Sequence, residues 1–188
     1  MRIEQKRFAV KHTFTFSEQQ LNFAFKDRSG SGDVDVAYAD IPKKKSVRID
    51  ENSWLRNAGI LWCAIGVAAL LLKWSGVMWL PIGIACLVWY HFSKVRYTIL
   101  QAEEGSIWVI QDKKHDDILR EISDRRNRQL LSWYGEINYE NDPQSEIKKF
   151  NWLAEQEVLS KEQADMKIAE VKMKAWMQST ESTGNLLN

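Results

Sequence analysis

The sequence predicts an α+β membrane protein: a transmembrane α-helical hairpin inserted in a small antiparallel β-sheet plus helix domain, followed by a C-terminal αα-hairpin. Two long apolar runs within residues 54–93 predict the transmembrane hairpin. Apolar and polar residues alternate with period two on both sides of these runs, which predicts strands. Two helical patterns after residue 143 predict the αα-hairpin.

The charge balance excludes a general attraction to nucleic acid. The chain has 188 residues, with 26 basic and 25 acidic side chains and a formal net charge of +1. Any electrostatic function must therefore come from local clusters of charge. The mean hydropathy is −0.40, as for a soluble protein, so the apolar residues are concentrated in one segment. We expect no nucleic-acid partner.

The apolar segment is long enough for two membrane-spanning helices. Residues 58–72 carry no charge, and a helix from Trp54 to Trp74 would be roughly 30 Å long, the thickness of a bilayer core. A second run covers residues 77–92, and only residues 73–76 connect the two, so the helices must be antiparallel. The alternative is a buried hairpin in a soluble protein. It is disfavoured because little other apolar material remains to cover two such helices.

Aromatic and basic residues around this segment predict its place and orientation. Aromatic side chains of the kind that gather at membrane interfaces lie near the predicted helix ends: Trp54, Trp74, Trp79, Trp89 and Tyr90. Basic residues flank both outer ends, whereas the connecting loop has Lys73 alone. The positive-inside rule therefore predicts a two-helix, multi-pass protein of the inner (plasma) membrane with cytoplasmic N- and C-termini.

Small residues inside the apolar runs allow close helix packing. They are Ala58, Gly59, Gly66, Ala69, Gly83 and Ala85. Cys63 and Cys86 also lie inside these runs, where we interpret them as packing residues and not as a disulfide or a metal site.

The flanking segments predict one cytoplasmic domain that is split in sequence. Strands are expected at residues 8–16, 21–27 and 34–41 before the membrane segment, and at 96–102 and 106–112 after it. A helix is expected from 114 to 134, with Asp124, Arg125, Arg126 and Arg128 mostly solvated. Residues 1–50 and 94–137 are therefore interpreted as two halves of one domain.

This order of elements resembles the bacterial pleckstrin-homology-like domains. The resemblance covers residues 8–50 and 94–137, and it rests on the strand GSIWVIQD at 105–112 and the helix DDILREISDRRNRQL at 116–130. A domain split by a transmembrane hairpin departs from the usual arrangement of that family.

The C-terminal part predicts an αα-hairpin over residues 143–178 and a disordered tail over 179–188. Asp142 is the expected N-cap of the first helix, with Pro143 at its first position, and Ser160 and Gln163 have capping-box spacing.

Residues 147–171 resemble the short C-terminal SHOCT domain. The matching positions are Leu153, Val158, Leu159, Ser160, Glu162, Lys167 and Val171. The match departs at the turn, where Gln156 and Glu157 stand near the usual glycine. The resemblance implies docking or oligomerisation, for which we expect Phe150, Leu153, Leu159, Ile168 and Val171 to serve in protein interaction.

Nothing in the sequence predicts catalysis. His12, His91 and His115 lie in no nucleophile, zinc or phosphate-binding context, so we expect no catalytic, cofactor-binding or metal-binding residue and no cofactor. Basic residues near the membrane predict contact with lipid headgroups, each worth about 1 kcal/mol, although they could serve only to set topology. They are Lys43, Lys44, Lys45, Arg48, Arg56, Lys94 and Arg96.

Three functions are consistent with these patterns. The first is a non-enzymatic, membrane-anchored binding or scaffolding module, with membrane lipids and a protein partner or a second copy as its partners. The second is an effector whose transmembrane hairpins oligomerise and permeabilise the membrane. The third is an accessory subunit of a larger membrane complex.

Overall fold

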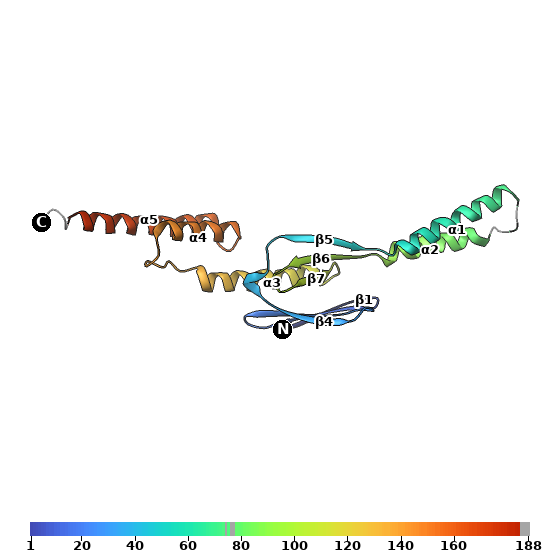
Figure 1. Ribbon diagram of the computed structural model, residues 1–188, viewed down its shortest axis with the longest axis horizontal. Coiled ribbons are helices and arrows are strands. Elements are labelled where there is room, and N and C mark those ends of the chain that lie inside the picture. The colour runs from blue at the N-terminus through green and yellow to red at the C-terminus, as the bar shows by residue number, and fades with distance from the viewer. Residues whose placement is uncertain (74, 76–77, 185–188) are drawn as a thin grey trace.

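The computed structural model describes the backbone of residues 1–73, 75 and 78–184, and side chains as far as residue 177. These residues form an α+β fold with two antiparallel sheets and five α-helices. The molecule is elongated (Figure 1). The two sheets and helix α3 (His115–Tyr134) form the middle, which we call the body. Helices α1 (Ser53–Leu71) and α2 (Trp79–Ser93) project from one end as the arm, and α4 (Pro143–Glu155) and α5 (Lys161–Gly184) lie at the other end.

The first sheet has four strands in sequential order: β1 (Arg2–Arg7), β2 (Val10–Phe16), β3 (Gln20–Lys26) and β4 (Ser31–Ala37). The expectation of three strands before the membrane segment misses β1, because RIEQKR has a single apolar residue. The expected strand at 8–16 begins only at Val10, since Phe8 turns the chain with a φ of 52°. The expected strand at 34–41 ends at Ala37, where a 3₁₀ turn, η1 (Tyr38–Asp40), follows.

The second sheet joins residues from both sides of the arm. Strand β5 (Lys45–Asp50) pairs antiparallel with β6 (Val95–Gln101), from Lys45 opposite Leu100 to Asp50 opposite Val95, and β6 pairs with β7 (Ser106–Ile110). The predicted hairpin at 96–102 and 106–112 therefore exists, and it gains β5 as a third strand. The arm is inserted between two hydrogen-bonded strands, so β5 and β6 hold its two ends side by side.

An apolar core joins both sheets and α3. It includes Phe14 and Leu21 from the first sheet, Ile107 from the second and Ile118 from α3, all 0% exposed. The predicted helix at 114–134 is therefore present, and its Ile118 and Ile122 face the core. The two halves that the sequence separates by the arm share this core.

Arg126 of α3 is buried, which corrects the expectation that it is solvated. Its side chain is 7% exposed, and its Nε donates to the backbone carbonyl of Ile41 at 2.8 Å. The guanidinium also donates to the side-chain oxygen of Gln156 in the turn between α4 and α5. Arg126 thereby fastens the C-terminal helices to the body.

The αα-hairpin begins and turns as its sequence predicts. The Asp142 side chain accepts a hydrogen bond from the backbone N–H of Ser145 at 3.0 Å, and Pro143 opens α4. Ser160 and Gln163 form a reciprocal capping box, with backbone N–H donors at 3.2 and 2.9 Å from the partner side chains. Helix α5 continues to Gly184, into the tail expected to be disordered, and residues 185–188 lie outside the described residues.

Candidate functional site

The arm is the most apolar part of the described structure. Among the described helices, α1 alone is long and apolar enough to cross a membrane, while α2 is apolar but shorter. At 1.5 Å per residue, the 19 residues of α1 span about 28 Å and the 15 residues of α2 about 22 Å. The sequence-predicted limits of 54–93 agree with these helices at both outer ends.

The two helices of the arm pack closely because glycines lie at their contact. A Cβ built on Gly83 would stand 2.5 Å from the backbone nitrogen of Cys63, and one on Gly66 would stand 2.6 Å from the backbone nitrogen of Leu80. Real Cβ atoms do not come this close to backbone, so the helices approach only where side chains are absent. Of the six small residues predicted for this role, four are buried: Gly59, Gly66, Ala69 and Gly83.

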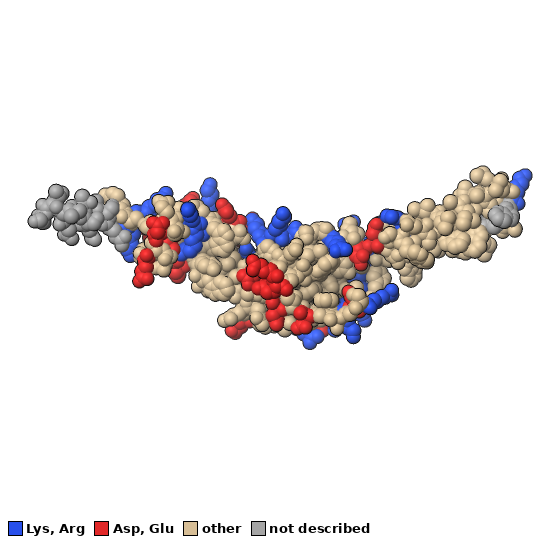
Figure 2. Space-filling model, viewed as in Figure 1, with Lys and Arg blue, Asp and Glu red and all other residues tan. Residues whose placement is uncertain are grey.

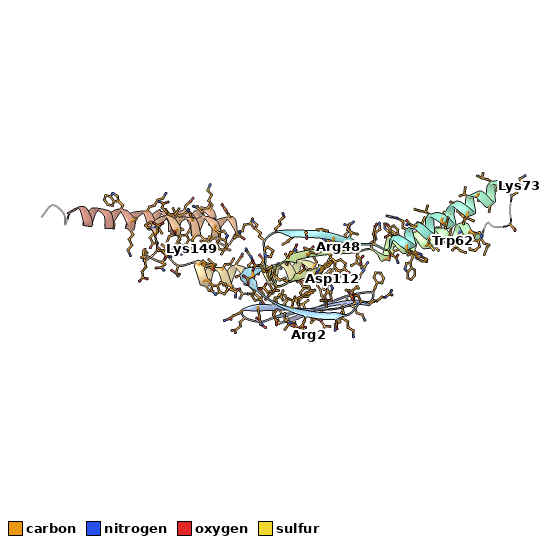
Figure 3. The ribbon with its side chains drawn as sticks, in the orientation of Figure 1. Arg2, Arg48, Trp62, Lys73, Asp112 and Lys149 are labelled. Atoms are coloured by element: carbon orange, nitrogen blue, oxygen red, sulfur yellow. The ribbon has the colours of Figure 1, made fainter. Side chains whose placement is uncertain are left out.

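The outer surface of the arm is apolar and exposed. In Figure 2 the arm is tan along its length, with blue at its tip and mixed charge at its base. Figure 3 places Lys73 at that tip. Large apolar side chains on this surface are 41–79% exposed, and they include Ile60, Leu61, Leu71, Ile82, Ile84 and Val88.

The predicted interfacial aromatics occupy both ends of the arm. Trp54 is 75% exposed at the start of α1 and Trp89 is 69% exposed near the end of α2, so both lie near the body. Trp79, at the start of α2, stacks on Trp62 with ring centroids 4.4 Å apart. Trp62 is not one of the aromatic residues predicted for the interface. Trp74 lies outside the described residues.

A charged cluster closes the base of the arm, and we call it the base cluster: Glu51, Arg56, Tyr90 and Lys94. The Glu51 carboxylate accepts from the Tyr90 hydroxyl at 2.7 Å and from Arg56 at 3.2 Å, with the Lys94 ammonium 3.8 Å away. The Lys94 ammonium also lies 4.4 Å from the centroid of the Tyr90 ring. The Tyr90 hydrogen bond and the neighbouring positive charges lower the pKa of Glu51.

The base cluster ties the segment that leads into α1 to the end of α2. Three of its members are residues predicted for the membrane surface, whereas Glu51, which contacts all three, is not. An acidic residue two positions before a helix gives no pattern by itself. Only the return of the chain through α2 brings Tyr90 and Lys94 next to it.

The other predicted headgroup residues are distributed along β5 and β6. Lys43 pairs with Glu157 at 2.7 Å, and Lys44 and Lys45 are exposed at the same end of β5. This end is about 17 Å from Asp50, where β5 reaches the base of the arm, because a strand rises about 3.4 Å per residue. Arg48 lies over the ring of Trp108, 5.4 Å from its centroid, and Arg96 is exposed near the arm.

The predicted interaction residues of the C-terminal helices lie in their interior. Phe150 and Leu153 are 0% exposed, and they pack with Leu130 of α3 and with Ile168 and Val171 of α5. Leu159 is partly buried against the same cluster. A surface contact with another protein would therefore have to use other side chains of these helices.

No protein-family model, curated protein or solved structure matches the chain. Inference about its function must therefore come from the geometry of the arm, the base cluster and the body.

Proposed function

We propose that the protein is a non-enzymatic, membrane-anchored binding or scaffolding module. In this proposal α1 and α2 insert into the inner membrane, and the body and C-terminal helices lie on the cytoplasmic side. The single observation that carries the proposal is the arm, which exposes apolar side chains on its outer surface and projects away from the body. Water would disfavour such a surface at about 25 cal/mol per Å² of apolar area, whereas lipid would not.

The distribution of charge supports the proposed orientation. Arg56, Lys94 and Arg96 gather at the base, and Lys73 is at the tip. By the positive-inside rule the base faces the cytoplasm. Basic side chains at this level attract anionic headgroups by about 1 kcal/mol each, so these three residues are better placed for lipid contact than Lys43, Lys44 and Lys45.

The packing inside the arm favours an anchor over a pore. An effector that assembles from hairpins needs small residues for contacts between subunits. Gly59, Gly66 and Gly83 are instead used for contact between α1 and α2 of one chain. We therefore retain the anchor as the proposed role. The resemblances to pleckstrin-homology-like and SHOCT domains are consistent with lipid and protein binding by the cytoplasmic part.

A cysteine-accessibility experiment tests the anchor. Cys63 and Cys86 are replaced by serine, and single cysteines are introduced by Lys73→Cys at the tip and Glu103→Cys in the turn between β6 and β7. A membrane-impermeant maleimide should label the tip on intact cells, and it should label the turn only after lysis. Labelling of both positions on intact cells, or of neither, contradicts the proposed topology. Release of the protein by alkaline carbonate contradicts membrane insertion altogether.

A further inference from the structure

A cavity lies between the two sheets, on the side of the body that faces the arm. Its volume is about 390 Å³, within the range of small-molecule sites. Strands β2 and β3 supply one wall, and β5, β6 and β7 supply the other. The lining side chains are Val10, His12, Phe23, Phe25, Asp27, Arg48, Asp50, Tyr97, Ser106 and Trp108.

The walls of this cavity are largely aromatic. The ring centroids of Phe23 and Phe25 are 6.2 Å apart, and those of Tyr97 and Trp108 are 5.6 Å apart. The His12 ring lies between the two sheets, 5.2 Å from Phe23 and 5.9 Å from Tyr97. These faces suit the apolar body of a ligand, and they also attract cations through their ring electrons.

His12 contributes a buried ring to the lining. Its side chain is 5% exposed, and its Nδ1 has no hydrogen-bond partner among the described residues. Burial lowers the pKa of His12, so the ring carries no charge near pH 7 and does not repel a cation.

Two carboxylates also line the cavity. The side chain of Asp27 accepts hydrogen bonds from Ser29 and Gly30, which hold it in place and lower its pKa. The side chain of Asp50 forms no hydrogen bond or ion pair with the other described residues. Arg48 is the one lining side chain with a full positive charge, and it lies over Trp108. The lining therefore carries two carboxylates and one guanidinium, an excess of negative charge.

We propose that this cavity binds a small organic ammonium compound, an amine joined to an aromatic or other apolar body. The ammonium group pairs with the carboxylate of Asp50 and lies against the aromatic walls, on which the apolar body also packs. A neutral ligand of the same shape leaves the carboxylate unpaired, and an anionic ligand is repelled by it, so the cavity selects for positive charge. This site is independent of the membrane anchor.

Isothermal titration calorimetry of the full-length protein in mild detergent tests the proposal, with phenethylamine as the probe and protein-free micelles as the blank. Phenethylamine should bind saturably, and 2-phenylethanol, which replaces the charged amine with a hydroxyl, should bind about tenfold more weakly. Asp50→Asn should weaken the binding of phenethylamine about tenfold. Glu103→Gln removes one negative charge from a turn outside the cavity, and it should leave the affinity unchanged.

Three results would overturn the proposal. They are no saturable binding of phenethylamine in the millimolar range, equal affinity for the amine and the alcohol, and equal loss of affinity in Asp50→Asn and Glu103→Gln.

Discussion

Gln5 substitutes for a neighbouring strand at the edge of the second sheet, and its replacement by leucine tests this role. Strand β7 is an edge strand, and the backbone N–H of Gln111 donates to Arg96 of β6 at 2.9 Å. In an antiparallel pair the preceding residue, Ile110, then points its N–H and C=O away from β6. The Gln5 amide pairs with both groups, at 2.9 and 2.7 Å.

The expected cost of Gln5→Leu follows from these contacts. Gln5 is 1% exposed and Ile110 is 2% exposed, so water has little access to the two backbone groups once the amide is removed. Leucine nearly fills the same volume, which leaves loss of pairing as the main change. An unpaired buried polar group costs about 1–3 kcal/mol. For two groups we expect a loss of about 2–5 kcal/mol in the free energy of unfolding of the body.

Intrinsic tryptophan fluorescence during heating in non-ionic detergent provides the assay. For a protein of this size, a loss of about 2–5 kcal/mol lowers the melting temperature by roughly 5–20 °C. Gln20→Leu is the matched control, because Gln20 is an exposed glutamine in β3 and its replacement should cost less than about 0.5 kcal/mol. Equal melting temperatures for the two variants would refute the reasoning.

Three further perturbations follow from the arm, α3 and the base cluster. Gly83→Ala should loosen the arm by about 1–3 kcal/mol, because its Cβ meets backbone at 2.5 Å. Gly59→Ala should cost less, because its Cβ meets the Leu87 side chain at 2.8 Å and comes no nearer to backbone than 3.2 Å. Hydrogen exchange in α1 measures the difference, and equal exchange contradicts it. Arg126→Met should lower the free energy of unfolding by about 1–3 kcal/mol, and thermal melting should show no such loss for Arg120→Met on the exposed face. The base cluster lowers the pKa of Glu51 in the folded protein. The ionised Glu51 therefore stabilises the fold fully at a pH above its ordinary pKa of 4.5, and this stabilisation is lost as the pH falls through the lowered pKa. The difference in melting temperature between native protein and Glu51→Gln should therefore shrink on acidification, and a constant difference contradicts this.

Local patterns predicted the helices well. The starts of α4 and α5 could be predicted because Asp142, Pro143, Ser160 and Gln163 act on backbone within three residues of themselves. The apolar runs predicted the arm, because a helix that is apolar on all sides needs no knowledge of its neighbours. The glycines in these runs predicted close helix packing, because a residue without a side chain allows close approach whatever lies opposite. Which residues lie opposite each glycine was shown only by the structure.

Strands β1 and β5 and the buried Arg126 were not predictable in this way. All six residues of β5 are exposed, so the short alternation of Val47 and Ile49 with polar neighbours does not mark a buried face. It is a strand because its backbone pairs with β6, which the sequence places on the far side of the arm. Arg126 resembles the charged residues beside it, and only the approach of Ile41 and the turn at Gln156 buries it.

The sequence by itself determined which segments are apolar on all sides, where the caps lie and where apolar and polar residues alternate. The tertiary structure alone decided which groups meet across long separations: Glu51 with Tyr90 and Lys94, Gln5 with Ile110, and His12 with the aromatic walls of the cavity. The physical reason is range. Caps and periodicity depend on residues a few positions apart in the sequence. The partner of a buried polar group depends instead on which groups the completed fold brings within about 3 Å of it.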